Sequence, residues 1–176
     1  RQSIGRALDM TSGLPDVREC LTLLGLSVYT HTNAESLLEF LSTMNRLNFN
    51  AGSEISYSNT GYRLVEAAFE RKGLFFKDFV KSEISDLLDT SIEVPDIWAD
   101  PVKGLAPGYW KSGDKWQESA AGLQLSASGS LAGSGMTLTK WAQALLEDEG
   151  PLNGLLSRLS AERFLNDGRP TGYGLG

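Results

Sequence analysis

Residues 52–62 of this chain read GSEISYSNTGY, and they connect a glycine-containing turn to an apolar pattern typical of an amphipathic helix. Tyr57 and Asn59 stand two positions apart within this stretch, where the loop meets the helix. A phenol and a carboxamide fixed at such a junction can face one cleft, in which a phenol moves protons and an amide binds a carbonyl group. Tyr57 and Asn59 are therefore the candidate catalytic residues.

Each of these residues also has an ordinary structural interpretation. Tyr57 could be a half-buried aromatic that closes the turn, and Asn59 could be the N-cap of the following helix. A Tyr-x-Asn triplet arises by chance in many chains of this length, so the triplet alone favours the structural interpretation, whereas the segments around it favour the catalytic one. Ser12 and Ser58 are disfavoured as nucleophiles because neither has a base beside it in the sequence.

Helical periodicity dominates the rest of the chain, with apolar residues at helical spacing over residues 1–10, 32–48, 60–72, 76–87, 137–149 and 160–165. Thr32 and Glu35 form a capping-box pair, Thr137 is a predicted cap, and Gly73 ends the helix that follows Asn59. Prolines and glycines interrupt residues 90–135. We predict a mainly α fold with short strands and loops, in a single unit without internal repeats.

Tyr109, Trp110 and Trp116 bring three aromatic rings into this loop-rich middle part. Such rings can line a substrate site, but they more often anchor loops or enter the core. We expect the core or anchoring role here.

Composition restricts the classes of partner. The chain has 176 residues, of which 41% are hydrophobic and 22% charged, as in an ordinary globular protein. Its formal net charge of -6 leaves no basic stripe for phosphates, so no nucleic acid is expected as a partner. No apolar run approaches the roughly 18 to 20 residues of a membrane span, so none is predicted in this chain.

Cys20 and His31 are the only cysteine and the only histidine. Leucines surround Cys20, which predicts a buried and inert thiol, and a lone cysteine excludes an internal disulfide. His31 stands near a predicted helix start, where a surface or capping role is expected, and a multi-histidine zinc site is excluded within this chain. Asp16 and the other carboxylates lack the spacing of a glycosidase or metal site and are expected to be solvated.

Several short segments occur in a fixed order around Tyr57. They are TSGLPD at residues 11–16, YSN at 57–59, GY at 108–109, ASGSL at 127–131 and GYGLG at 172–176. In this order they resemble the serine β-lactamase and penicillin-binding-protein superfamily, specifically its class C-like branch of D,D-carboxypeptidases, D-aminopeptidases, D-amino-acid amidases and esterases. The resemblance spans nearly the whole chain. It implies the helical region of a β-lactamase-like α/β (transpeptidase-like) fold, with residues 1–176 as a single partial domain from its middle portion.

The resemblance also implies roles for particular residues. The family uses a Ser-x-x-Lys nucleophile motif, a Tyr-x-Asn motif, and a Lys-Thr-Gly or His-x-Gly motif. Tyr57 matches the proton-transferring tyrosine and Asn59 the substrate-orienting asparagine. We expect the Ser-x-x-Lys motif to be absent from this chain and to lie upstream of Thr11, and the third motif to lie beyond Gly176. Met10 departs from the pattern, since many relatives have histidine there.

The implied activity is that of a serine hydrolase, which attacks an amide or ester carbonyl through an acyl-serine intermediate without a metal or organic cofactor. The partner would be a small-molecule or peptide substrate: a β-lactam, a D-amino-acid peptide or a small ester. A periplasmic or extracellular location follows if the substrate is a cell-wall peptide or a β-lactam. We expect the chain by itself to be inactive, and to self-associate if its helices expose an apolar face.

Two other interpretations stay open on the sequence. One is a non-catalytic relative that keeps the β-lactamase-like fold as a binding or scaffold protein. The other is an unrelated helical interaction domain that matches the segments by accident. The complete form of the non-catalytic relative would lack the Ser-x-x-Lys motif while keeping the turns. In the unrelated domain, replacement of Tyr57 by phenylalanine would change only local stability, whereas the enzyme would lose turnover.

Overall fold

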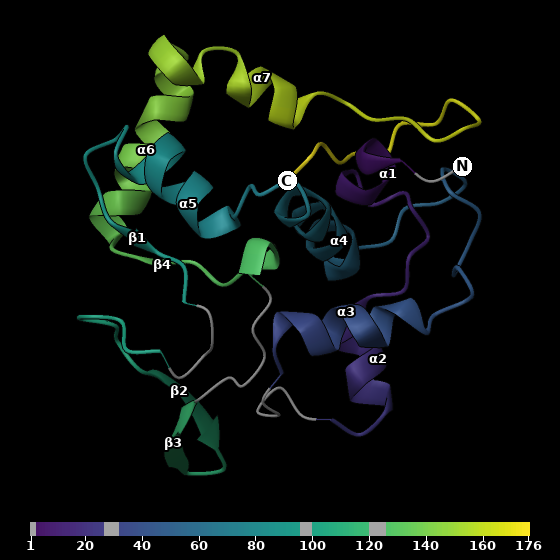
Figure 1. Ribbon diagram of the computed structural model, residues 1–176, viewed down its shortest axis with the longest axis horizontal. Coiled ribbons are helices and arrows are strands. Elements are labelled where there is room, and N and C mark those ends of the chain that lie inside the picture. The colour runs from purple at the N-terminus through teal and green to yellow at the C-terminus, as the bar shows by residue number, and fades with distance from the viewer. Residues whose placement is uncertain (1–2, 27–31, 96–99, 120–125) are drawn as a thin grey trace.

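The computed structural model describes residues 3–26, 32–95, 100–119 and 126–176, which form a mainly helical structure with few, short strands (Figure 1). This confirms the predicted fold class. The α-helices are α1 (Ile4–Leu8), α2 (Val17–Leu23), α3 (Ala34–Ser42), α4 (Asn59–Glu70), α5 (Phe76–Val80), α6 (Gly135–Glu147) and α7 (Leu155–Ser160). The strands are β1 (Ile92–Glu93), β2 (Gly108–Ser112), β3 (Lys115–Ser119) and β4 (Ala132–Gly133).

Helix α4 lies at the centre of the structure and contacts both α1 and α2 (Figure 1). Its approach to α1 is close because Gly61 has no side chain: a Cβ at this position would lie 2.2 Å from the Ala7 carbonyl oxygen. A hydrophobic cluster beside this contact joins α2 to α3 through Val17, Leu21, Leu37 and Leu41. The segment that carries Tyr57 and Asn59 therefore begins a helix that is packed on two sides.

Helix α4 also buries a complete charge pair. The side chain of Arg63 is almost fully buried, and its Nη1 lies 2.5 Å from Glu66 Oε2. The same Glu66 oxygen accepts a hydrogen bond at 3.3 Å from the backbone N–H of Ala127, which lies in the short 3-10 helix Ser126–Ser128. Glu66 thus pairs with the buried Arg63 and, through the Ala127 N–H, also ties a distant segment to α4.

The boundaries of the predicted helices differ in places. The helix predicted over 32–48 begins after Asn33, whose side chain accepts from the Ser36 N–H at 2.8 Å, and so Thr32 is not its N-cap. It ends at Ser42, because the next N–H groups bond three residues back and tighten the last turn. Asn48 then donates to the Gly13 carbonyl at 2.8 Å, a tertiary contact that draws the chain away from the helix axis.

The helix predicted over 76–87 continues from α5 through a π-helical turn, Lys81–Ser85. Only Val80 of its predicted apolar residues is fully buried, whereas Phe79 is 54% exposed. The helix predicted over 160–165 is wrong, because α7 ends at Ser160 and the following residues form a turn in which Leu165 N–H donates to the Arg169 carbonyl. Helix α6 is capped by Ser134, whose hydroxyl accepts from the Thr137 N–H, and not by Thr137.

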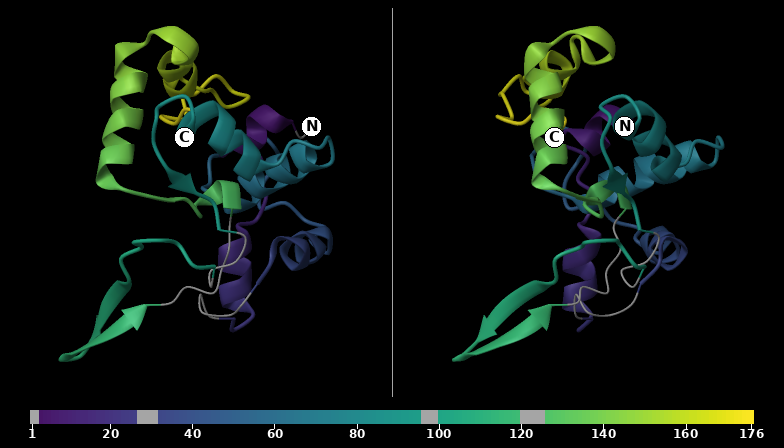
Figure 2. Two further views of the ribbon diagram at one scale, coloured as in Figure 1. Left: turned by 60° about the vertical axis from the view of Figure 1, so that its left-hand side comes forward. Right: turned by 90° about the vertical axis from the view of Figure 1, so that its left-hand side faces the viewer.

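The strands form two separate antiparallel pairs. β1 pairs with β4 over two residues each, and β2 pairs with β3 as a hairpin that projects away from the helices (Figure 2). Tyr109, Trp110 and Trp116 on this hairpin are exposed, so the expected core or anchoring role is wrong. The physical reason is that neither face of the projecting hairpin is covered by a second layer.

Among the described residues, no helix combines the length and the apolar character that crossing a lipid bilayer requires.

Candidate active site

Tyr57 and Asn59 lie together where an extended segment enters α4. Ser58, between them, is extended at φ -152° and ψ 119° and is buried, while Asn59 is the first residue of the helix. The Tyr57 hydroxyl donates to Asn59 Oδ1 at 3.3 Å. Tyr57 is 62% exposed, so its ring is accessible rather than half-buried, and Asn59 is not the N-cap of α4.

Asp16 is the residue of this site that sequence reasoning missed. It is 5% exposed, so the expectation of a solvated carboxylate is wrong. Its Oδ2 accepts hydrogen bonds from the Asn59 backbone N–H at 2.5 Å and from Asn59 Nδ2 at 2.8 Å. These contacts allow the carboxylate to be buried, because hydrogen bonds from several N–H groups replace those that water would donate to it. The partners are separated by 43 positions, so no local spacing could have revealed them.

The segment TSGLPD lies next to the candidate site and is bonded to the start of α4. The Thr60 hydroxyl donates to the Pro15 carbonyl at 2.6 Å and accepts from the Val17 N–H at 2.9 Å. Gly13 adopts φ +75°, and a Cβ there would lie 2.2 Å from the Phe49 carbonyl oxygen. Only glycine fits such a turn without displacement. The loop is thereby fastened to the first turn of α4.

Met10 lies directly under the Tyr57-Ser58-Asn59 segment. Its sulfur accepts from the Ser58 N–H at 3.3 Å, its carbonyl oxygen accepts from the Ser56 N–H at 2.9 Å, and its side chain is 4% exposed. Its backbone is left-handed, with φ 63°, which is uncommon for a residue that has a side chain. Met10 therefore supports the backbone of the site from below.

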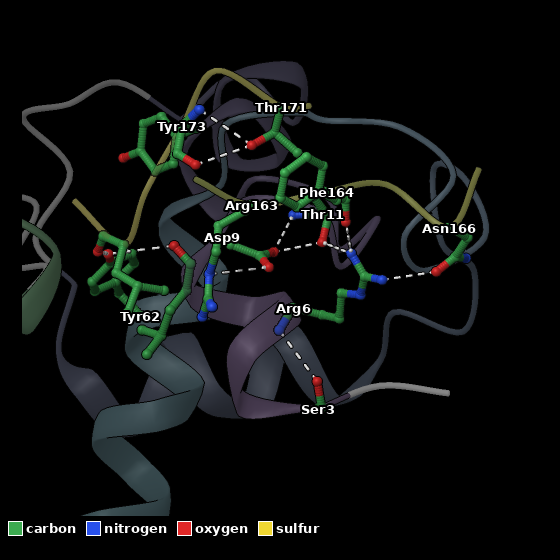
Figure 3. Close-up of polar contacts among 12 residues, drawn as sticks. Ser3, Arg6, Asp9, Thr11, Tyr62, Arg163, Phe164, Asn166, Thr171 and Tyr173 are labelled. Carbon is green, nitrogen blue, oxygen red and sulfur yellow. Dashed lines mark hydrogen bonds and ion pairs between the residues drawn. The ribbon is translucent and has the colours of Figure 1, made fainter. Parts of the chain in front are cut away.

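A polar network joins residues of the N-terminal part of the chain to residues near the C-terminus (Figure 3). Arg6 donates to the Thr11 hydroxyl at 3.1 Å, to the Phe164 carbonyl at 3.0 Å and to Asn166 Oδ1 at 2.7 Å. Asn166 in turn donates from its backbone to the Gly52 carbonyl at 2.8 Å. The turn that precedes Tyr57 is therefore held by residues from two distant parts of the sequence, one near each end of the chain.

The C-terminal segment GYGLG also returns to α4. The Tyr62 hydroxyl donates to the Leu175 carbonyl and, at 3.4 Å, to the Leu8 carbonyl. Burial is the main cause that raises the pKa of Tyr62 above its ordinary value, and the nearby phenols of Tyr173 and Tyr57 raise it further. Tyr62 is thus a structural phenol that keeps its proton over a wide pH range.

The chain does contain one Ser-x-x-Lys spacing, Ser112-Gly113-Asp114-Lys115. The expectation that no such spacing occurs in the sequence is therefore wrong. In the structure these residues form the tip of the β2–β3 hairpin, where Ser112 and Lys115 are paired across the turn. All of them are exposed, and the hairpin projects away from α4 (Figure 2). The spacing here is a product of the hairpin turn, with glycine at φ +60°.

Other reactive groups lie apart from Tyr57 and Asn59. Cys20 is partly buried in α2, and the pKa of its thiol is raised by burial and then by the carboxylates of Asp16 and Glu19. His31 lies outside the described residues. Within the described ranges, no group of three or more histidine, cysteine, aspartate or glutamate side chains could hold a metal ion.

An apolar groove of about 570 Å³ runs between α4 and α5. Its lining includes Tyr62, Val65, Phe69, Phe75, Phe76 and Phe79. The groove contains neither Tyr57 nor Asn59, so its apolar character does not describe the candidate site.

Solved structures share this fold. A D-stereospecific amidohydrolase from Streptomyces sp. superposes with a TM-score of 0.77 at 18% identity, over 98% of this chain and 55% of that one. A penicillin-binding protein from Bacillus halodurans gives 0.72 at 18% identity, over 95% and 54%. A D-amino acid amidase from Ochrobactrum anthropi SV3 gives 0.67 at 21% identity, over 83% and 42%. The chain thus spans about half the length of these structures.

No curated protein sequence matches the chain. The family model for Beta-lactamase, in contrast, matches residues 3–176, which is almost the whole chain, and this agrees with the fold and with the order of its short segments. The chain belongs to the Beta-lactamase family.

Proposed function

We propose that this chain supplies the Tyr-x-Asn part of the active site of a serine hydrolase that cleaves amide or ester bonds. The observation that carries the proposal is the junction before α4, where the Tyr57 hydroxyl meets Asn59 Oδ1 and the Asn59 amide is held by buried Asp16. An exposed phenol beside a fixed carboxamide is suited to proton transfer next to a bound carbonyl group.

The chemistry assigns one role to each group. A serine hydroxyl attacks the substrate carbonyl, the new C–O bond forms, and the serine proton passes to the leaving amine or alcohol as its bond to the carbonyl carbon breaks. Water then hydrolyses the acyl-serine ester and restores the hydroxyl. Tyr57 would carry the proton between serine and leaving group, and Asn59 would orient the substrate. No metal or organic cofactor takes part in these steps.

The nucleophile is proposed to lie outside these 176 residues, upstream of Thr11. The Ser112-x-x-Lys115 spacing does not supply it, because an exposed hairpin tip directed away from α4 cannot place a serine beside Tyr57. The chain by itself is therefore proposed to be an inactive, partial domain from the middle of the hydrolase. Replacement of Ser112 by alanine in the complete polypeptide should leave turnover unchanged.

The proposed substrates are D-amino-acid amides and peptides, with β-lactams and small esters as further members of the class. The names of the similar structures support this range, since one is a D-stereospecific amidohydrolase, one a penicillin-binding protein and one a D-amino acid amidase. At 18–21% identity these likenesses establish the fold, so the substrate has to be determined by assay.

The decisive experiment replaces Tyr57 by phenylalanine in the complete polypeptide. Because Tyr57 is exposed and its hydroxyl makes a single long hydrogen bond, the variant should have the same thermal unfolding midpoint as the wild type. Turnover of a D-amino-acid amide should fall by about 10²- to 10⁴-fold, the usual loss for a proton-transfer group. Tyr109→Phe, on the projecting hairpin, is the control that should retain full activity.

A variant with unchanged turnover would refute the catalytic role of Tyr57. The folded complete polypeptide should also be tested on D-amino-acid amides, D-amino-acid peptides, β-lactams and small esters. Hydrolysis of none of these would favour the non-catalytic binding or scaffold protein.

A further inference from the structure

The two carboxylate oxygens of Asp16 accept hydrogen bonds from the beginnings of two different helices, α2 and α4. Oδ1 accepts hydrogen bonds from the backbone N–H groups of Arg18 at 2.9 Å and Glu19 at 3.0 Å, and so caps α2. Oδ2 accepts from the backbone N–H and the side-chain Nδ2 of Asn59. The two functions therefore belong to different atoms and can be separated by substitution.

The chemistry of Asn59 makes its contact with Asp16 directional. A carboxylate oxygen only accepts hydrogen bonds, so the NH2 end of the Asn59 amide has to face Asp16. A rotated amide would set its carbonyl oxygen against the carboxylate oxygen, and two acceptors repel each other in a buried site. With one of the two Nδ2 protons of Asn59 bonded to Asp16, the Asn59 carbonyl oxygen faces the Tyr57 hydroxyl, as observed.

The N-cap residue of α4 does not hold the first turn of the helix through its own side chain. Ser58, its N-cap, makes no side-chain capping bond, whereas Asp16, the N-cap of α2, supplies an acceptor for the Asn59 N–H. The Asn59 backbone N–H and side-chain amide are thus bonded to the same oxygen atom, and both lose this acceptor if that atom is removed.

We propose that Asp16 is a positioning residue of the active site, which holds the Asn59 carboxamide in the single orientation that presents its carbonyl oxygen to Tyr57. This inference rests on the proposed function for its catalytic consequence, but not for the contact itself. Asp16 touches neither the substrate nor the reacting atoms in this arrangement, and it acts through Asn59.

Asp16→Ser is the variant that separates the two functions. Serine is about as good an N-cap as aspartate, so its hydroxyl can still accept from the first turn of α2. It has one side-chain oxygen and a shorter reach, so it cannot also bind both N–H groups of Asn59. Asn33→Ala, which removes the cap of α3 without touching Asn59, is the matched control for lost capping.

The first measurement is the nuclear magnetic resonance signal of the Asn59 side-chain amide in the complete wild-type polypeptide, assigned by its disappearance in Asn59→Ala. A bond from Nδ2 to a buried carboxylate should shift one of the two NH2 protons downfield and slow its exchange with solvent. The shift should be lost in Asp16→Ser and kept in Asn33→Ala. Two NH2 protons with ordinary positions and exchange rates in the wild type would overturn the inference without any variant.

The second measurement is a double-mutant cycle on kcat/KM with a D-amino-acid amide. Asp16→Ser and Asn59→Ala should each lower kcat/KM by about 100-fold, the effect of misplacing a positioned group. In the Asn59→Ala background, Asp16→Ser should have less than about a 3-fold further effect, because its target is gone. Multiplicative losses, or an Asp16→Ser variant with wild-type kinetics, would overturn the positioning role.

Together with the Tyr57→Phe assay, these two measurements distinguish failure of the proposed hydrolase function from failure of the positioning role of Asp16. If the amide signal shows the Asp16 contact but Tyr57→Phe and Asn59→Ala keep full turnover, the proposed function fails and the contact stands as a structural cap. If Tyr57→Phe abolishes turnover while the Asp16 and Asn59 losses multiply, the hydrolase stands and the positioning role fails.

Discussion

Individual residues in this chain are held by partners from distant parts of the sequence. Asn59 is fixed by Asp16, and the turn before Tyr57 is tied to Asn166 through the Gly52 carbonyl. Gly61 shows the same dependence for packing, since its missing side chain lets the backbone of α1 approach α4. At these positions, the residue type that fits depends on a partner atom that lies far away along the chain.

Gly61→Ala is predicted to destabilise the protein. The new methyl group would lie 2.2 Å from the Ala7 carbonyl oxygen, so α1 has to move away from α4. A loss of about 1–3 kcal/mol in the free energy of unfolding is expected, as for other overpacked sites. Gly135→Ala is the control: this glycine begins α6 with nothing within 4 Å of a Cβ, and the substitution should be neutral or slightly stabilising. Equal denaturation midpoints for both variants would contradict this packing.

Tyr62 is predicted to make stability depend on alkaline pH. Its pKa is raised in the folded state by burial, so the folded protein keeps the phenol proton after the unfolded chain has lost it. Stability should therefore be complete below the ordinary phenol pKa of about 10 and should fall as pH rises above it. Denaturant midpoints measured from pH 8 to 11 should show a smaller decline in Tyr62→Phe than in the wild type. Tyr109→Phe, with its ring exposed on the hairpin, should decline as the wild type does; an identical decline in Tyr62→Phe would contradict the assignment.

The helices differ in how their first turns are satisfied. Ser134 caps α6 with its own hydroxyl, and Asn33 caps α3 with its side-chain carbonyl. Helix α4 is the exception among these, since the buried hydroxyl of Ser58 has no hydrogen-bond partner in the described part of the chain, and Asp16 provides the acceptor in its place. The N-terminus of α4 is consequently part of the tertiary structure and not a local feature.

Two serine substitutions should therefore have different effects although both residues are N-caps. Ser134→Ala should lower the free energy of unfolding by about 1 kcal/mol, because the Thr137 N–H loses its acceptor. Ser58→Ala should be neutral or stabilising, because it removes a buried hydroxyl that makes no hydrogen bond. Thermal or urea unfolding of the two variants side by side measures this difference. A cost for Ser58→Ala as large as that for Ser134→Ala would show that its hydroxyl is bonded after all.

In the molecule as a whole, helix α1 and the C-terminal segment both lie against α4 (Figure 1). Leu175 accepts from Tyr62, and Arg6 bonds to Phe164 and Asn166, so segments near the two ends of the sequence are tied to each other and to α4. The groove between α4 and α5 shares Tyr62 with these contacts and leaves phenylalanine rings accessible, with Phe69 48% exposed and Phe79 54% exposed. Exposed apolar surface of this kind favours association.

The 176-residue chain on its own is predicted to self-associate through this groove. Its sedimentation coefficient should rise with concentration, and Phe79→Glu should reduce the rise because a charge would be buried in an apolar contact. Leu146→Glu is the control, since this residue of α6 is 75% exposed and lies outside the groove. Equal effects of the two substitutions would show that added charge, and not the groove, controls association.

Part of this structure could be predicted from the sequence because it rests on local rules. Periodicity located α4 to within two residues at each end, and Gly73 ends it as predicted, with φ +75° and a bond to the Glu70 carbonyl. The prolines and glycines of residues 90–135 predicted short strands and loops in that part of the chain. The order of the short segments indicated the family that the family model confirms.

The sequence by itself thus determined the helical class, the family, and the candidate pair Tyr57 and Asn59, whose catalytic role stays a prediction. Only the tertiary structure decided that α3 ends at Ser42, that Asp16 is buried against Asn59, and that Ser112 and Lys115 lie at a projecting hairpin tip. The physical reason is the same in each case. Helix periodicity and turn chemistry act over a few residues, whereas these features depend on a hydrogen bond or on an uncovered surface created when distant segments meet.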